Sequence, residues 1–363
     1  MEKEGKKVSH YTFTKSLGAG QFAHVYLATS SVDNKEYAVK VIHKSKMNTG
    51  GDPERMKKLL SNEVSIMSSI THPNIIHLHN YLESSNNYYL VIDYCNGGDF
   101  ERYLRTKPGG RLPESEAITF MKQIMNGFQC LHENKIMHRD FKLANLFMHD
   151  GHVVIGDFGM AKSGYEMTQT ALGSPLTTAP EVLREDSYSS KADLWSVGTV
   201  FYYLLFGKYP FFAMSIPELM KVINQTAGDK LPFDPKITDV SEQCKSLLRA
   251  MLQPDPAKRI DWERLFDHPL FNKNTNPELS KALHMLVNTA GIQSVDQLFA
   301  RNRESIKRHE ETEQLRDPMR EYLNKILPFV LNDAMSANSG DLSPVSNLEK
   351  LYFEASFRYH HEN

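Results

Sequence analysis

Residues 138–145 read HRDFKLAN, a short polar run whose side chains suit one kind of chemistry. Asp140 can accept the proton of an attacking hydroxyl, and Lys142 can neutralise a phosphoryl group as it moves between oxygens. Asn145 offers an amide oxygen to magnesium. Few other chemistries need these groups so close together, so the run favours phosphoryl transfer from a nucleotide.

A second motif, DFG, follows at residues 157–159, and Asp157 offers a carboxylate oxygen to the same metal as Asn145. In this order, the two motifs resemble the catalytic and metal-binding loops of eukaryotic protein kinases. The resemblance implies ATP and Mg²⁺ as cofactors and transfer of the γ-phosphoryl group. The catalytic residues that it implies are Asp140, Lys142, Asn145 and Lys40.

The resemblance also implies an α+β fold with two lobes. Strand-like runs dominate the first part of the chain, with one helix-like apolar stripe at residues 53–70. The run Asn96-Gly97-Gly98 predicts a flexible hinge, and long helices are predicted beyond it at 113–134 and 189–205. The predicted strands are 11–17, 23–28, 36–42, 75–81 and 88–93. The predicted domain comprises a small antiparallel-sheet lobe at 11–92, a hinge at 93–98 and a larger, mainly helical lobe at 99–271.

The flanking regions carry none of these motifs. Residues 1–10 are interpreted as an N-terminal tail, and 272–363 as a helical C-terminal extension with a Ser/Asn/Gly/Pro-rich linker at 336–347. An apolar stripe at residues 322–331 needs a surface to bury against. Its partner could be the kinase domain, another chain or a regulator.

Composition excludes several classes of protein. The chain has 363 residues and is 40% hydrophobic, which gives room for two or three compact units. A net charge of −2 argues against a dedicated nucleic-acid or membrane surface. Cys95, Cys130 and Cys244 are widely spaced and odd in number, so neither a disulfide framework nor a zinc site is predicted. Without an apolar leader or about 18 consecutive apolar residues, we expect a soluble, cytoplasmic protein with no transmembrane segment.

The turn at residues 18–25 reads GAGQFAHV and lies between two predicted strands. Its glycines would let the backbone approach phosphates, although an ordinary hairpin turn has the same composition. No parallel βαβ unit follows, which disfavours a Rossmann site. Ala23 replaces the third glycine of the kinase pattern. The phosphate lid implied by the resemblance comprises Leu17, Gly18, Ala19, Gly20, Gln21, Phe22, Ala23, His24 and Val25.

Lys40 ends the run YAVK, which resembles the kinase strand whose lysine holds the α and β phosphates. A single lysine on a strand is usually only solvated. Glu63, in the helix predicted at 53–70, stands where the family places the glutamate that pairs with this lysine. Because the pair would form only when the helix swings in, it would act as a switch.

The run Asp93-Tyr94-Cys95 follows an apolar strand, and the resemblance implies that its backbone binds adenine. Ile92 would close the back of the pocket. Asp99 would meet the ribose or a substrate side chain, or it is only a helix cap. The residues implied around the base and ribose are Val25, Ala38, Ile92, Asp93, Cys95, Asp99 and Phe147.

Residues 157–181 have the length and boundaries of a kinase activation loop, which ends in APE. Arg139, beside the catalytic aspartate, would otherwise be an unpaired buried cation, and a loop phosphate is its usual partner in the family. Thr170 is the candidate for that phosphate and Thr168 is the rival, with an upstream kinase or autophosphorylation as the source. Loop threonines are mostly unmodified, so this is a hypothesis.

Lys142, two residues after Asp140, follows the serine/threonine pattern, so we expect protein Ser or Thr hydroxyls as acceptors. In such enzymes Ser174 supplies the hydroxyl that bridges Asp140 and Lys142. Thr177 departs from the family, which usually has an aromatic residue there, so the substrate-docking loop should differ in shape.

Further residues match the kinase framework. Asp193 corresponds to the aspartate that holds the catalytic loop, and Arg259 to the buried partner of Glu181. Such an ion pair is costly to break, because the surviving charge is left buried. The structural residues implied are Arg139, Glu181, Asp193 and Arg259. Met67, Leu78, His138 and Phe158 match a stacked apolar spine, although ordinary core packing would explain them equally.

Within the family, YCNGGDF at 94–100 and GSP at 173–175 look most like the ULK autophagy-initiating group. That resemblance implies a role in autophagy or stress signalling. The alternative is a pseudokinase, a nucleotide-binding scaffold that acts through its C-terminal extension. A pseudokinase would have lost a catalytic residue, and none is lost here.

Overall fold

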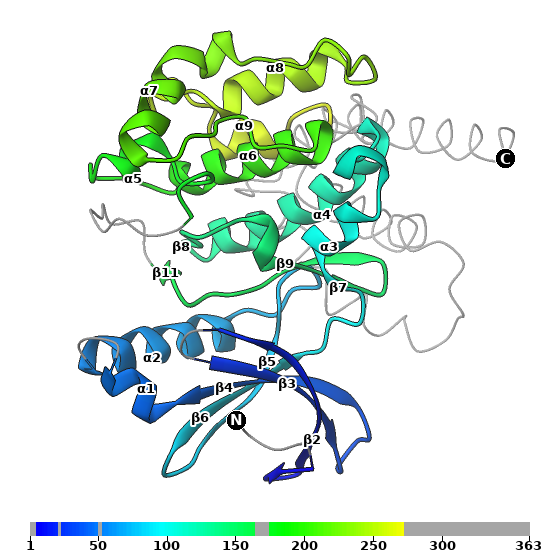
Figure 1. Ribbon diagram of the computed structural model, residues 1–363, viewed down its shortest axis with the longest axis vertical. Coiled ribbons are helices and arrows are strands. Elements are labelled where there is room, and N and C mark those ends of the chain that lie inside the picture. The colour runs from blue at the N-terminus through cyan, green and yellow to red at the C-terminus, as the bar shows by residue number, and fades with distance from the viewer. Residues whose placement is uncertain (1–4, 21–22, 50–52, 164–173, 272–363) are drawn as a thin grey trace, which may run out of the picture. The chain divides into compact units, whose positions relative to one another are not determined.

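The computed structural model describes residues 5–20, 23–49, 53–163 and 174–271. They form a β-sheet lobe and a larger helical lobe, as Figure 1 shows. Some predicted features lie outside the described residues. These are Gln21, Phe22, Thr168, Thr170, and the extension 272–363 with its linker at 336–347.

The small lobe is built on one antiparallel sheet with the strand order β1-β2-β3-β4-β6-β5. Its strands are β1 (Lys7–Val8), β2 (Tyr11–Ala19), β3 (Ala23–Ser30), β4 (Glu36–His43), β5 (Leu78–Glu83) and β6 (Asn87–Asp93). Side chains alternate between the two faces. One face buries an aromatic and β-branched cluster that includes Phe13, Tyr26 and Val39. The other face joins the main core, which contains Leu90 and Met67.

Two helices accompany this sheet, α1 (Lys44–Thr49) and α2 (Pro53–Ser69), and Figure 1 shows α2 on the side nearest β8 and β11. The helix predicted at 53–70 is therefore present. α1 was not predicted, because six residues are too few to show a helical period. Lys7 and Val8 pair with β2, so part of the expected tail belongs to the sheet.

The strand predicted at 75–81 begins later, at Leu78. Ile75 instead forms a parallel bridge to Ile155, and the backbone N–H of Ile76 donates to the Ile155 carbonyl at 2.8 Å. Ile155 belongs to β10 (His152–Ile155) in the large lobe. The segment 75–78 therefore has two structural roles. Ile75 and Ile76 join the two lobes, and Leu78 begins β5.

The glycines predicted as a flexible hinge are held in close contact. Gly97 donates its N–H to the Met148 carbonyl at 2.9 Å, and a Cβ at Gly97 would lie 2.6 Å from the Met148 Cβ. Gly98 has a positive φ of 74° and begins β7 (Gly98–Asp99), which pairs with β9 (Leu146–His149). Glycine is therefore required here for tight packing at Gly97 and for backbone geometry at Gly98, and the flexibility of the hinge stays a prediction.

The large lobe is mainly helical. Its helices are α3 (Phe100–Arg105), α4 (Glu114–Glu133), α5 (Pro180–Leu183), α6 (Lys191–Phe206), α7 (Ile216–Thr226), α8 (Glu242–Met251) and α9 (Trp262–Phe266). Two short strands, β8 (Ile136–Met137) and β11 (Lys162–Ser163), pair beside the site. The single-turn 3₁₀ segments are Pro108–Gly110, Leu143–Asn145 and Gly228–Lys230.

α6 is the central helix of this lobe. It is apolar on all sides and nearly every residue in it is buried, as expected for a helix enclosed by others. A Cβ at Gly198 would lie 3.0 Å from the side chains of Met251 and Leu252, so glycine lets the α8 region approach closely. No helix in the described ranges has the length and apolar character to cross a membrane.

Candidate active site

The catalytic loop is anchored to α6 through its backbone. The N–H groups of His138 and Arg139 donate to the two carboxylate oxygens of Asp193 at 2.7 and 2.8 Å. Burial raises the pKa of Asp193, and His138 together with these two N–H groups offsets part of the rise. The loop is thereby fixed to the most buried helix of the large lobe.

Asp140 lies at the centre of a hydrogen-bonded cluster. Lys142 Nζ donates to Asp140 Oδ2 at 2.7 Å and to Ser174 Oγ at 3.0 Å. The Ser174 backbone N–H donates to Asp140 Oδ1 at 3.1 Å, and Asn145 Nδ2 donates to the Asp140 carbonyl at 2.8 Å. The sequence predicted that the Ser174 hydroxyl would bridge Asp140 and Lys142. In the structure the hydroxyl contacts Lys142 and the backbone N–H contacts Asp140.

Lys40 and Glu63 come together from β4 and α2. Lys40 Nζ lies 2.7 Å from Glu63 Oε1 and 3.6 Å from Asp157 Oδ1. Burial alone would lower the pKa of Lys40, but Glu63 and Asp157 raise it on balance. Burial also opposes ionisation of Asp157, but Lys40 and His138 hold its pKa below the usual value. Lys40 is therefore a cation, and Asp157 an anion, at neutral pH.

Asn145 and Asp157 provide the oxygen ligands expected for magnesium. Asn145 uses its Nδ2 toward Asp140, and its amide oxygen accepts no hydrogen bond from any described residue. The backbone N–H of Gly156, next to Asp157, donates to the Asn145 carbonyl at 2.8 Å and keeps the two motifs together. An all-oxygen donor set suits Mg²⁺, which in nucleotide sites takes further ligands from phosphates and water. The residues present therefore fit the expected cofactor.

The two ligands do not make a metal site alone. No group of three or more His, Cys, Asp or Glu side chains within the described ranges could hold a metal ion. Asp157 has φ of 58°, in the left-handed region that is uncommon for residues other than glycine. Such backbone strain is often found at functional sites.

Four of the residues predicted around the nucleotide share one face of the small-lobe sheet. Val25 is paired with Lys40 across β3 and β4, and Ala38 with Ile92 across β4 and β6. Directly paired residues point to the same face, and so do residues two apart on one strand. Val25, Ala38, Lys40 and Ile92 therefore line a common surface, on which Ala38 leaves room for a flat ring.

In the hinge, Asp93 forms contacts through its side chain and Cys95 through its backbone. The Asp93 carboxylate accepts from the His77 backbone N–H at 2.8 Å and lies 2.6 Å from His79 Nε2, so it faces β5. The Cys95 carbonyl accepts from Gly98 at 3.1 Å, while the Cys95 N–H has no hydrogen-bond partner among the described residues. That N–H is the free donor that an adenine ring requires.

Asp99 caps α3, because its Oδ1 accepts from the Arg102 backbone N–H at 2.6 Å. Of the alternatives left open by the sequence, the structure contains the helix cap. The Phe147 ring packs on Gly156, where a Cβ would lie 2.8 Å from the ring. In the glycine-rich turn, Leu17 is 39% exposed, and Gly20 donates to the Ala23 carbonyl at 2.8 Å.

Comparison with known families decides what this arrangement is. The model of the protein kinase domain matches residues 11–271. This chain belongs to the protein kinase family. The two-lobed α+β fold predicted from the sequence is confirmed.

The relatives of this kinase are of the serine/threonine type. It is 36% identical over 280 residues to the serine/threonine-protein kinase atg1 of Dictyostelium discoideum, which covers 75% of this chain and 40% of that protein. It is 35% identical to human serine/threonine-protein kinase ULK3, over 72% of this chain and 55% of that protein. The match to Arabidopsis thaliana ATG1c, at 32% identity, covers 93% of this chain and 44% of that protein. The kinase thus spans about half the length of these relatives, and the predicted resemblance to the ULK group is confirmed.

Arg139 of the kinase lies next to Asp140 with φ of 71°. Its guanidinium lies 5.9 Å from the centre of the Tyr188 ring, and its buried Nε has no hydrogen-bond partner among the described residues. The side chain is half-buried, less than the sequence predicted. Its expected phosphate partners, Thr168 and Thr170, lie outside the described residues.

The structural ion pair of the kinase is completely enclosed. Arg259 donates two hydrogen bonds to Glu181, at 2.7 and 2.9 Å, and two more to the carbonyls of Gln253 and Lys191. Both charged side chains are almost fully buried. The predicted spine is also internal: Met67, Leu78 and Phe158 belong to one buried core, and the rings of His138 and Phe158 are 5.1 Å apart.

Thr177 is accommodated by a local turn. Its backbone N–H and its Oγ1 both donate to the Ser174 carbonyl, at 3.0 and 3.2 Å, and Ser196 Oγ donates to the Thr177 carbonyl at 2.7 Å. The smaller side chain is therefore buried without an unsatisfied hydroxyl.

A pocket beside the catalytic loop was missed by sequence reasoning. It has a volume of about 230 Å³ and adjoins Lys142 and Ser174. Its other lining residues are Glu101, Ala144, Pro175, Leu176, Thr177 and Tyr209. Ala144 and Leu176 lie inside or beside recognised motifs, so they could have been predicted as site residues from the sequence. Glu101 and Tyr209 come from distant segments, and no local sequence pattern connects them to the site.

Substitution of Glu63 by Gln in this kinase is expected to lower kcat/KM for ATP by roughly ten- to hundredfold. The change replaces the carboxylate by a neutral amide and so removes the ion pair with Lys40; hydrogen bonds between charged groups contribute about 1.5–3 kcal/mol. Initial rates at varied ATP concentration measure the effect. The control is Glu54→Gln, an exposed position on the same helix. Equal kinetics for Glu63→Gln and Glu54→Gln would contradict a role for the pair.

Proposed function

We propose that this chain is an ATP-dependent serine/threonine protein kinase, which transfers the γ-phosphoryl group of Mg-ATP to protein hydroxyls. The observation that carries the proposal is the cluster in which Lys142 and the Ser174 N–H hold the carboxylate of Asp140. When bound, Mg-ATP supplies the phosphoryl group and a positive charge that favours its transfer.

Each catalytic residue has a role that follows from its position in the site. Asp140 orients the acceptor hydroxyl and takes its proton. Lys142, already within hydrogen-bond distance of Asp140, neutralises charge on the acceptor side, and Lys40 does so on the nucleotide side. Asn145 and Asp157 would hold the metal through their oxygens.

Acceptor class is supported by the surroundings of Ser174. Its hydroxyl accepts from Lys142 and its N–H donates to Asp140, so the loop that follows it is joined to the catalytic residues. Together with the serine/threonine type of the relatives, this supports Ser or Thr acceptors.

Transfer of radiolabelled γ-phosphate to a generic basic protein, followed by phosphoamino-acid analysis, tests the activity. We expect phosphoserine or phosphothreonine, and loss of transfer when EDTA removes Mg²⁺. Phosphotyrosine as the main product would overturn the acceptor class. Nucleotide binding without transfer to any acceptor would favour the scaffold alternative.

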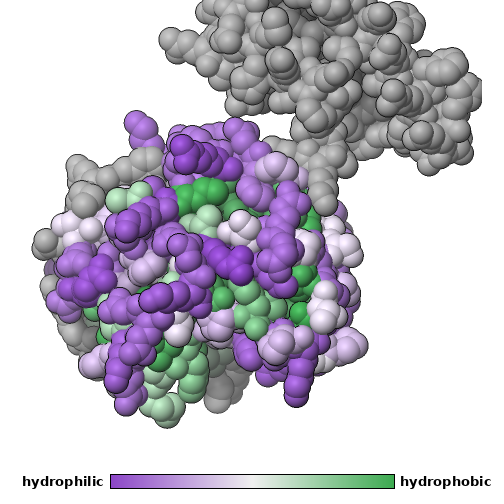
Figure 2. Space-filling model, turned by 90° about the horizontal axis from the view of Figure 1, so that it is seen from above, coloured by the Kyte–Doolittle hydropathy of each residue, from purple (hydrophilic) through white to green (hydrophobic). Residues whose placement is uncertain are grey.

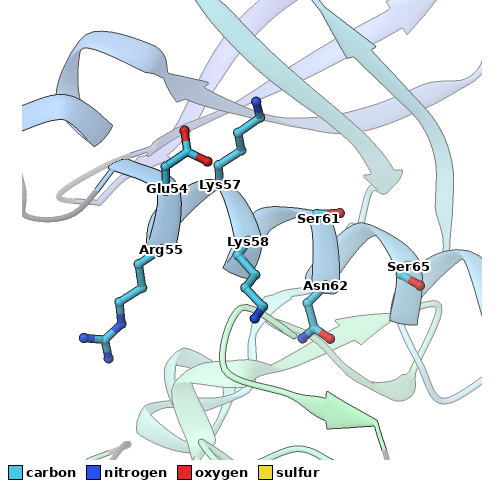
Figure 3. Close-up of a pocket in the computed structure, with 7 residues that line it drawn as sticks. All are labelled: Glu54, Arg55, Lys57, Lys58, Ser61, Asn62 and Ser65. Carbon is cyan, nitrogen blue, oxygen red and sulfur yellow. The ribbon is translucent and has the colours of Figure 1, made fainter.

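We also propose that a phosphate on the activation loop regulates the enzyme. The guanidinium of Arg139, whose Nε has no hydrogen-bond partner among the described residues, is one cation available to it. Others are on α2, where a groove of about 800 Å³ is lined by Glu54, Arg55, Lys57, Lys58, Ser61, Asn62 and Ser65. In Figure 3, Arg55, Lys58 and Asn62 extend from one side of α2, and Glu54 and Lys57 from the other. Asn62 Nδ2 donates to the carbonyl of Ala161, in the first part of the activation loop, at 2.7 Å, so this side of α2 contacts that part of the loop.

Substitution of Thr170 by Ala is expected to lower kcat at least about tenfold, because a phosphate there would make charge-assisted hydrogen bonds to the cations described above. Rates are compared after incubation with ATP, with Thr168→Ala in parallel. Loss of activity in Thr168→Ala alone would move the site to Thr168. Unchanged activity in both variants would refute regulation at these threonines.

We further propose that the kinase acts in autophagy or stress signalling in the cytoplasm, as its resemblance to the ULK group implies. Identity of 35–36% with atg1 and ULK3 supports that branch of the family. Cells lacking this chain should show altered autophagic flux on starvation. Normal flux would separate the enzyme from that pathway.

A further inference from the structure

Asp93, the last residue of β6, is bound through its side chain to the start of β5. Its Oδ2 accepts from the His77 backbone N–H at 2.8 Å, and its Oδ1 lies 2.6 Å from His79 Nε2. Burial alone would raise the pKa of Asp93, but the hydrogen bonds from His79 and from the His77 N–H keep it below the usual value. Asp93 is therefore an anion that can only accept, so His79 Nε2 donates. We call these three residues the hinge clamp.

A β-bulge sets the direction of the His79 side chain. The flanking pairs across β5 and β6 are Leu78 with Ile92, and Asn80 with Val91. The register therefore shifts at His79, which has no residue of β6 opposite it. Bulges are frequent beside active sites, where they change the direction of a side chain.

The His79 ring is held between two other rings, although it is exposed. Its centroid lies 4.9 Å from that of Tyr37 and 4.7 Å from that of His77, with both neighbours edge-on. Hydrophilic side chains cover most of the large-lobe end seen in Figure 2, and exposed side chains ordinarily change rotamer freely. His79 is instead restricted by its two neighbours and by its hydrogen bond to Asp93.

The hinge clamp contributes little to the stability of the fold. His79 and Asp93 are 33% and 32% exposed, and ion pairs that are open to water are weak. β5 and β6 are also joined by their own backbone pairing. What the clamp determines is the position of Asp93, the first residue of the hinge.

The hinge backbone after Asp93 carries the group that meets the base. The Cys95 N–H has no hydrogen-bond partner among the described residues, while the Cys95 side chain is buried in the main core. From Gly97 onward the chain is bound to the large lobe, because the Gly97 N–H donates to the Met148 carbonyl at 2.9 Å. Tyr94 and Cys95 therefore lie between two attachments, one in each lobe.

A backbone in a fixed orientation can distinguish the two purine bases. Adenine presents an acceptor nitrogen beside an amino donor, whereas guanine presents an N–H donor beside a carbonyl acceptor. A backbone N–H that pairs with the adenine nitrogen would face a donor in guanine. Both groups would then be left without a partner, and sites built on hydrogen bonds discriminate strongly for this reason. A backbone that can turn to present a carbonyl loses this discrimination.

We propose that the hinge clamp holds the hinge backbone in the orientation that selects adenine over guanine. Asp93 is the positioning residue, and His79 and the His77 N–H hold its carboxylate. The proposal rests on the ATP-dependent activity proposed above. It deepens that activity, because it assigns the choice of nucleotide to side chains that face β5.

Kinetics and binding with ATP and GTP on the full chain test this proposal. Initial rates of transfer to a generic basic protein give kcat and KM for each nucleotide. Competition with a fluorescent nucleotide analogue gives each Kd without any need for transfer. We expect His79→Ala and Asp93→Ala to lower the preference for ATP over GTP about tenfold, the factor that about 1.4 kcal/mol produces. The change should appear in KM and Kd, with kcat retained and Tm close to that of the wild type.

Two further variants separate positioning from a general effect on the small lobe. His79→Gln should restore most of the preference, because its amide N–H can donate to Asp93 in place of Nε2. Glu83→Ala is the matched control, since it removes an exposed ion pair with Lys44 at the other end of β5. It should leave the preference unchanged.

An unchanged preference in both alanine variants, or a wild type that does not prefer ATP, would overturn the role of the hinge clamp. Equal weakening of ATP and GTP, or the same loss in Glu83→Ala, would also overturn it, because the effect would then be a general loss of affinity. Absence of transfer by the wild type with either nucleotide would instead overturn the proposed activity, and the ratio of the two Kd values would still test the clamp.

Discussion

Substitution of Asp140 by Asn is expected to lower kcat by about 10²–10⁴-fold, the range associated with loss of a general base. The amide keeps the size of the side chain and can still accept from the Ser174 N–H. It removes the carboxylate that binds Lys142 at 2.7 Å and that takes the proton of the acceptor hydroxyl. The loss should appear in kcat, while the affinity for ATP changes little, because Asp140 is on the acceptor side.

Phosphate transfer to protein and fluorescence of a bound nucleotide analogue measure these two quantities separately. Asp150→Asn is the matched control, since Asp150 is an exposed carboxylate on the turn after β9. Transfer by Asp140→Asn at the wild-type rate would exclude Asp140 as the base. A parallel loss of nucleotide binding would indicate a folding defect instead, which circular dichroism would detect.

Substitution of Arg259 by Met is expected to produce the largest loss of stability, about 3–5 kcal/mol, because Glu181 would be left as a buried, unpaired charge. Arg259 makes four hydrogen bonds in the structure, two of them to Glu181. At about 2–4 °C per kcal/mol for a domain of this size, the Tm should fall by roughly 10 °C. Thermal and urea unfolding measure the change.

The matched control is Arg184→Met, which removes one partner of an exposed ion pair with Asp186. Exposed pairs contribute about 0–1 kcal/mol, so this variant should unfold close to the wild type. The double variant Arg259→Met/Glu181→Met should recover part of the loss, because no uncompensated charge remains. If Arg259→Met lowered the free energy of unfolding no more than Arg184→Met does, the claim that an unpaired buried charge at Glu181 destabilises the fold would be contradicted.

Much of the fold could be predicted because its signals are local. The period-2 and period-3.6 patterns located β2, β3, β4, β6 and the long helices to within a few residues. The errors came from contacts that a local pattern cannot contain. Gly97 is glycine because a Cβ there would meet Met148, about fifty residues later. The backbone of Ile75 bridges to Ile155 in the large lobe, and its side chain is buried there.

Part of the candidate site could likewise be predicted from local sequence, and part could not. The motif residues Asp140, Lys142 and Asn145 stand together in the sequence, so their cluster could be predicted. The orientation of the Asp93 carboxylate toward His77 and His79 could not, because it depends on the register of β5 against β6. Nor could the pocket at Tyr209, which depends on the path of the chain after α6.

The anchoring of the catalytic loop to Asp193 has a consequence for inhibitors. Among the described residues, the hydrogen bonds of the acceptor half of the site lie within the large lobe. Lys40 and Glu63 instead belong to the small lobe, and Lys40 forms an ion pair with Asp157 in the nucleotide half. A compound that holds the two lobes apart would prevent correct binding of the nucleotide. It would leave the hydrogen bonds of the acceptor half in place. We expect such a drug-bound enzyme to keep capturing its protein targets, so chemical inhibition and deletion of the gene should give different cellular outcomes.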